Sequence, residues 1–197
     1  MPKPLLSARY RLVVRDAQGR IKRIEEAPSK SFILNFLYLW WLSFNLNTTD
    51  SISVVNQSGS PTMLIPEEPV SWCWNSWGGT YSAIQIGSGT SSPSASSPYL
   101  ESLILSGTSP GQLSYGSYST TSPSVSSNPG TIQISSTFTN NSGGDVTVGE
   151  IGLAIQASNF GTGVYGAALI IHDVLSSAIS LPYGGTITVT YTLEVNT

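Results

Sequence analysis

The strand-like run at residues 186–195 is the sequence feature that most restricts how this chain can fold. Apolar residues alternate there without a break with threonine and glutamate: Ile187, Val189, Tyr191, Leu193 and Val195 against Thr186, Thr188, Thr190, Thr192 and Glu194. Successive side chains of a strand point to opposite faces, so the pattern predicts one buried and one solvated face. Such a strand needs a second layer to cover its buried face.

Two further patterns extend this prediction to an antiparallel sandwich. Ile132, Ile134 and Phe138 repeat the alternation less strictly, and the turn-forming run 140–144 (Asn-Asn-Ser-Gly-Gly) follows them. Residues 183–185 (Tyr-Gly-Gly) give a similar turn signal before the final strand. Turn signals between strand-like runs are typical of hairpins. We therefore expect a mainly-β chain that forms an antiparallel β-sandwich of the jelly-roll or Ig-like kind.

Charge divides the chain into two parts. All eight lysines and arginines lie within the first thirty residues, which also hold three carboxylates and so carry a net charge of +5. The rest of the chain has eight carboxylates and neither lysine nor arginine, a net charge of −8. We expect the basic segment to contact an acidic protein surface. A nucleic-acid partner is not expected, because the segment lacks aromatic platforms and a recognition helix.

The first 49 residues are expected to form a unit that packs on a sandwich body, residues 50–197. Arginine occupies alternate positions at Arg9, Arg11 and Arg15, and a turn at 16–19 leads to a second strand at 20–25. Together these runs predict a basic β-hairpin. A hairpin of this size needs a partner surface to be stable.

Residues 32–46 are bulky and almost entirely apolar. A serine just before them can cap a helix, and the run is too short to span a bilayer. We expect one short apolar helix buried against the sandwich or between subunits, and no membrane partner. A pair of buried strands stays open, because periodicity does not decide a short apolar run. The candidate assembly contacts are Arg9, Arg11, Arg15, Phe32, Phe36, Trp40 and Trp41.

A cluster of tryptophans offers a second kind of binding surface. Trp72 and Trp74 fall on one face of a strand-like run, and Trp77 follows in the next turn. Core packing or a subunit interface is the more common use of tryptophan. The alternative is a platform on which a host glycan stacks.

Catalytic and metal-binding patterns are absent from the sequence. The only histidine, His172, has no accompanying G-x-S-x-G elbow and is expected at a strand end or in a loop without a catalytic task. The single cysteine, Cys73, excludes an internal disulfide, and the carboxylates lack metal-loop spacing. We expect no enzyme, no cofactor and no metal. Since the body lacks cations, we also expect few ion pairs there and a weak dependence of folding on acid pH.

Several stretches, taken in order, resemble blocks of a known group of virion proteins. They are residues 86–94 (IGSGTSSPS) with 99–101 (YLE), then 138–144 (FTNNSGG) with 148–153 (VGEIGL), then 169–175 (LIIHDVL) with 187–191 (ITVTY). The residues of these blocks and their order along the chain are similar to those of tail- and fibre-associated structural proteins of tailed phages and related prokaryotic viruses. Two positions depart from that pattern: Pro98 replaces an aspartate, and His172 replaces an arginine.

The resemblance implies a non-enzymatic virion protein that assembles with itself and with other virion proteins. A tail, fibre, decoration or minor capsid component would all satisfy it. Two alternatives remain beside it: an icosahedral coat protein with a basic genome-facing segment, and a carbohydrate-binding module for host recognition.

Overall fold

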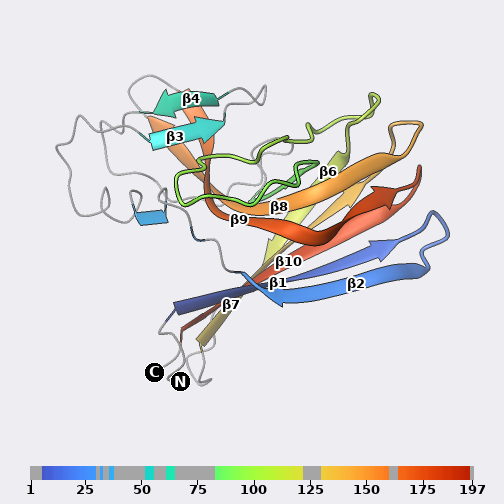
Figure 1. Ribbon diagram of the computed structural model, residues 1–197, viewed down its shortest axis with the longest axis horizontal. Coiled ribbons are helices and arrows are strands. Elements are labelled where there is room, and N and C mark those ends of the chain that lie inside the picture. The colour runs from blue at the N-terminus through green and yellow to red at the C-terminus, as the bar shows by residue number, and fades with distance from the viewer. Residues whose placement is uncertain are drawn as a thin grey trace.

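The computed structural model describes residues 6–29, 32, 36–37, 52–55, 61–64, 83–121, 130–159 and 164–195. These residues form ten strands: β1 (Leu6–Arg15), β2 (Ile21–Pro28), β3 (Ile52–Val55), β4 (Pro61–Leu64), β5 (Ile84–Gly87), β6 (Ser114–Thr120), β7 (Gly130–Thr139), β8 (Val146–Asn159), β9 (Val164–Leu181) and β10 (Thr186–Val195). The strands make two antiparallel sheets, in the orders β2-β1-β10-β7-β6 (sheet 1) and β4-β3-β9-β8-β5 (sheet 2). The prediction of a mainly-β chain with the character of a sandwich is confirmed (Figure 1).

The strictly alternating strand lies at the centre of sheet 1. β10 pairs over its full length with β1 on one side and with β7 on the other. Ile187, Val189 and Tyr191 are fully buried, as the alternation predicts. Val195, at the end of the strand, is half exposed. The pattern therefore identified the buried face correctly.

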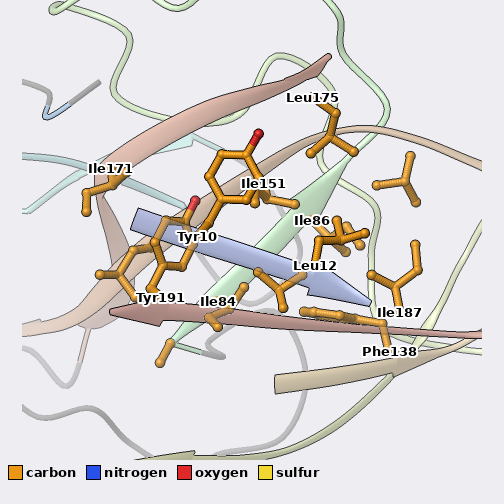
Figure 2. Close-up of a cluster of buried hydrophobic side chains, with 14 of the residues drawn as sticks. Tyr10, Leu12, Ile84, Ile86, Phe138, Ile151, Ile171, Leu175, Ile187 and Tyr191 are labelled. Carbon is orange, nitrogen blue, oxygen red and sulfur yellow. The ribbon is translucent and has the colours of Figure 1, made fainter. Parts of the chain in front are cut away.

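The two sheets enclose one apolar core. Tyr10, Leu12 and Phe138 of sheet 1 join Ile86 and Ile151 of sheet 2 in a single cluster of buried side chains (Figure 2). Each fully buried aliphatic or aromatic side chain of this kind contributes about 1.5–3 kcal/mol through the removal of apolar surface from water. This core holds the two sheets face to face.

The basic hairpin is part of sheet 1. β1 pairs with β2 across a turn in which Gly19 takes φ 77°, a backbone conformation that favours glycine. The other edge of β1 pairs with β10 at ten positions, so backbone hydrogen bonds join the hairpin to the body. The division of the chain near residue 49 stays a prediction.

The predicted helix at 32–46 lies almost wholly outside the described residues and also stays a prediction. Phe32 forms an isolated bridge with Ile171 of β9. The rings of Phe32 and Phe36 lie 5.1 Å apart and pack against the core of their own chain. Among the described residues, no helix is long and apolar enough to cross a membrane.

The two predicted turns pack against each other. Asn140 is fully buried, and its side-chain amide donates to the carbonyls of Gly144 and Leu181, each at 2.7 Å. Its backbone exchanges hydrogen bonds with Gly184 and Gly185 of the second turn. Both turns connect a strand of one sheet to a strand of the other, so this contact fixes where the chain crosses between layers.

A matched pair of substitutions on one face of β7 tests how far along the strand that face is buried. Ile134 is 1% exposed, whereas Ile132 on the same strand is 40% exposed. We expect Ile134→Ala to lower the free energy of unfolding by about 2–5 kcal/mol, because it leaves a cavity in a packed core. Ile132→Ala should cost well under half of that value. Urea unfolding followed by tryptophan fluorescence measures both, and equal losses would contradict the described packing.

Candidate functional site

A buried carboxylate on β8 is the centre of the candidate site. Glu150 has no exposed surface. Its Oε1 accepts hydrogen bonds from the backbone N–H groups of Gly89 at 3.1 Å and Ser102 at 2.8 Å. Its Oε2 accepts one from the backbone N–H of Glu101 at 3.0 Å and lies 2.7 Å from Nε2 of His172. One side chain thus ties the connection between β5 and β6 to both long strands of sheet 2.

Glycines allow this connection to pass so close to Glu150. A Cβ atom added at Gly87 would lie 2.4 Å from Oε1 of Glu150, and one added at Gly149 would lie 2.3 Å from the carbonyl oxygen of Gly89. Both distances are far below van der Waals contact, so neither position has room for a side chain. The Gly-Ser-Gly run at 87–89 therefore allows the close approach of this connection to Glu150.

His172 reaches Glu150 from the neighbouring strand. β8 and β9 pair so that Gly152 lies opposite His172 and Glu150 lies opposite Val174, which puts the two polar side chains diagonally on one face. The ring is 2% exposed, and its Nδ1 has no hydrogen-bond partner among the described residues. An ionised carboxylate only accepts, so Nε2 of His172 carries a hydrogen and donates it to Glu150. The residue lies inside β9, not at a strand end as the sequence suggested.

Hydrogen bonds decide the ionisation of Glu150. Burial by itself raises the pKa of a carboxyl group. The hydrogen bond from His172 and those from the backbone of Ser102 and Glu101 outweigh burial, and the net result is a lowered pKa for Glu150. The group is therefore a buried anion that four hydrogen-bond contacts stabilise.

A second carboxylate closes the loop above this pair. Oε2 of Glu101 accepts from the backbone N–H groups of Thr90 at 3.0 Å and Ser91 at 2.9 Å, and its Oε1 accepts from Oγ of Ser91 at 2.8 Å. The hydrogen bonds from Ser91 are the main reason that the pKa of Glu101 is lowered. These hydrogen bonds join Glu101 to residues about ten positions earlier in the chain and so hold the two ends of the loop together.

A pocket of about 240 Å³ lies between this loop and His172. It is lined by Ser91, Ser92, Pro93, Ser97, Pro98, Tyr99, Glu101 and His172. Tyr99 is 37% exposed, so part of its ring faces solvent. Within the part of the chain that the structure describes, no group of three or more His, Cys, Asp or Glu side chains is placed to hold a metal ion.

A separate polar cluster joins the two sheets near the hairpin. The hydroxyl of Tyr191 donates to Asp173 at 3.0 Å, and the hydroxyl of Tyr10 donates to Glu25 at 2.8 Å. Arg23 forms an ion pair with Glu25 and also donates to the carbonyl of Ser177 on β9. Burial and these carboxylates raise the pKa of both tyrosines. The cluster is a contact between layers in which every polar group named here has a partner.

The predicted contact residues of β1 lie on the outer face of sheet 1. Arg9 contacts Glu26 at 3.1 Å and Glu194 at 3.2 Å. Arg11 lies 4.0 Å from Glu26, and Arg15 donates to the carbonyl of Gly19 at 3.0 Å. The structure does not bring these arginines together with Phe32 and Phe36, which pack on the core. Trp40, Trp41, Trp72, Trp74 and Trp77 lie outside the described residues.

Comparisons of the chain with protein-family models, with curated proteins and with solved structures find no match. Sequence reasoning missed Glu150 and Glu101 as parts of one site. The available signal was the pair of glycines at 87 and 89, at the end of β5 and just after it, since glycine at a strand often marks a close approach of another backbone.

The expectation of weak acid dependence needs correction. It assumed that carboxylates without lysine or arginine partners would make little difference to pH stability. Instead, backbone N–H groups and His172 lower the pKa of Glu150, and hydrogen bonds similarly lower the pKa of Glu101. A carboxyl group with a lowered pKa stabilises the fold above its unfolded value, and this contribution is lost as the pH falls through the folded value.

We therefore predict an acid-sensitive stability that depends on Glu150. The wild-type protein should keep its full stability at pH 7 and lose it progressively as the pH falls below about 4.5, the ordinary value for glutamate. Glu150→Gln should cost about 1.5–3 kcal/mol at pH 7, because its amide meets donors where an anion accepted them. The variant should then lose less stability than the wild type between pH 7 and pH 3.

Asp145→Asn is the control for this experiment, because Asp145 is exposed and accepts one hydrogen bond from Ser180. It should leave both the stability at pH 7 and the acid profile close to those of the wild type. Denaturant titrations at a series of pH values give the free energies. Parallel profiles for the wild type and Glu150→Gln would refute the role of the buried anion.

Proposed function

We propose that this protein is a non-enzymatic structural component of a virus particle. It would be a tail, fibre, decoration or minor capsid protein that assembles through contacts between its own copies and with other virion proteins. The proposal combines the ordered sequence blocks, which resemble such proteins, with a β-rich fold of two antiparallel sheets.

One observation carries the proposal: three of the resembling blocks meet at Glu150. The block at 148–153 supplies Glu150 itself, and the block at 86–94 supplies the N–H of Gly89. The block at 169–175 reaches Glu150 through His172, the position at which this chain departs from the pattern. Gly89 is 61 positions and His172 is 22 positions away from Glu150 in the chain. Unrelated chance likenesses have no reason to converge on one side chain, whereas parts of a shared structural unit do.

The finer description of the fold belongs to the same proposal. The connections β7–β8 and β9–β10 each pass from one sheet to the other, a feature that jelly-roll and Ig-like sandwiches share. We propose a sandwich of this kind, with the short apolar helix at 32–46 packed against it or between subunits.

The charge distribution supports assembly contacts through the basic hairpin, but with fewer acidic partners than the net charge of the body suggests. Several body carboxylates are already engaged within the chain: Glu150 and Asp173 are buried, and Glu194 contacts Arg9. The acidic body is therefore less available to a second copy than its net charge implied. In the part of the body that the structure describes, individual exposed carboxylates such as Asp145 remain for a partner.

Assembly and its dependence on salt test this proposal. We expect the wild-type protein to form a symmetric oligomer, visible by negative-stain imaging and by mass measurement. Replacing Arg9, Arg11 and Arg15 together with glutamine should weaken assembly, and the loss should be largest at low ionic strength, where surface charges are least screened. A monomer at all concentrations would refute the proposal.

Arg20→Gln is the matched control within the hairpin, because Arg20 is held by Asp16 of its own chain at 2.7 Å. It should leave assembly unchanged. A closed shell in the images would favour the icosahedral coat protein. Binding to a glycan array that is lost when Trp72, Trp74 and Trp77 become alanine would favour the carbohydrate-binding module.

A further inference from the structure

We propose that the pocket beside His172 receives an arginine side chain from strand β1 of a second copy of this chain. The inference rests on the proposed function, because it names one contact through which copies would assemble. Four features of the described residues support it: the carboxylate that lines the pocket, the partners of the arginines, the size of the pocket and the placement of the two surfaces.

The described lining of the pocket holds one carboxylate, Glu101, and neither lysine nor arginine. Glu101 is ionised and uses three acceptor positions within the loop. A carboxylate has about four such positions, so one remains, on Oε1. Nδ1 of His172, on the same lining, is a buried polar atom without a partner among the described residues. The ligand that such a lining selects is a donor, and next to an anion a cationic donor is favoured over a neutral one.

The cations of this chain lie only in its first thirty residues, and two of those on β1 have incomplete partners. Arg9 has two carboxylates within 3.2 Å. Arg11 is half exposed, and its Nε lies 4.0 Å from Oε2 of Glu26. The other oxygen of Glu26 already forms an ion pair with Arg9. Arg15 donates to a carbonyl oxygen, and no carboxylate among the described residues contacts it. Arg11 and Arg15 are therefore the arginines with most to gain from a second carboxylate.

The shape of the pocket suits a single side chain. Its volume of about 240 Å³ lies below the ~300–1,000 Å³ of pockets that take drug-sized ligands. Tyr99 and the prolines at 93 and 98 provide flat apolar walls beside Glu101. A guanidinium group is planar, is weakly hydrated and stacks on aromatic faces, which matches a site with one carboxylate and one partly exposed tyrosine ring.

The two surfaces belong to different regions of the molecule, so they cannot be the same patch. The pocket lies on the connection after β5, which runs along β8, whereas the β1–β2 hairpin lies beyond β10 (Figure 1). A contact between different surfaces of two copies is heterologous, and such contacts build closed rings or filaments. Both forms occur naturally in an assembly made of repeated subunits.

A double-mutant cycle on assembly tests the contact. Glu101→Gln, Arg11→Gln and Arg15→Gln would be prepared singly and in pairs, and dissociation constants measured by analytical ultracentrifugation. We expect Glu101→Gln and at least one arginine variant each to weaken assembly about 5- to 30-fold, and their combination to cost little more than either alone. Full additivity for both arginines would overturn the inference.

Two further variants separate the pocket from the stability of its loop. Ser92→Lys places a cation in the pocket without removing the loop hydrogen bonds of Glu101, and it should weaken assembly by repelling the incoming arginine. Asp145→Asn removes an exposed carboxylate outside the pocket and should leave assembly unchanged. If Glu101→Gln and Ser92→Lys both assemble like the wild type, this inference fails and the proposed function stands. If the wild-type protein never assembles, the proposed function fails as well.

A direct binding experiment identifies the chemistry of the ligand. Methylguanidinium would be titrated into the ¹⁵N-labelled Arg11→Gln, Arg15→Gln double variant, whose pocket is free of arginine from other copies. We expect saturable shifts of the Ser91, Ser92 and Tyr99 amide signals, which Glu101→Gln removes. The absence of shifts overturns the inference, and so do shifts caused only by a methyl glycoside, which would instead assign the pocket to a sugar.

Discussion

The buried anion at Glu150 is the interaction on which the rest of sheet 2 depends. It joins β8 to β9 through His172 and joins both strands to the connection after β5 through three backbone N–H groups. A carboxylate in such a place is stable only when its hydrogen bonds are complete, because desolvation opposes the charged form. The glycines at 87 and 149 are part of this requirement, since a side chain at either would occupy the space of the contacts.

A low content of cations shapes how this protein uses its acidic residues. In a body without lysine or arginine, Glu150 and Glu101 take their hydrogen bonds from backbone N–H groups, serine and histidine. Asp173 is similarly held by the hydroxyl groups of Tyr191 and Ser29. The hydrogen bonds of these carboxylates order loops and connect the two sheets. In more highly charged proteins, ion pairs often have this role. Among the described residues, Glu150 and Asp173 of the body are buried, and every lysine and arginine lies on the β1–β2 hairpin.

The local strand and turn predictions were accurate where one face of a strand is buried. The alternation around Tyr191 and the glycine turns at 143 and 184 report directly on local geometry, so they could be read from the chain. The pairing of β1 with β10 could not, because it joins residues at opposite ends of the sequence. His172 was misplaced for a related reason: a lone histidine carries no sign of which carboxylate it will meet across a strand pair.

The sequence by itself determined the β-rich class, the buried faces of β7 and β10 and the separation of charge, because each depends on local side-chain order or on composition. The tertiary structure alone decided which strands share a sheet and that Glu150, Glu101 and His172 form one site with a pocket beside it. The physical reason is the range of the interactions. Alternation and turn chemistry act over a few residues, whereas the hydrogen bonds of Glu150 join segments up to 61 positions apart and exist only once the sheets have packed.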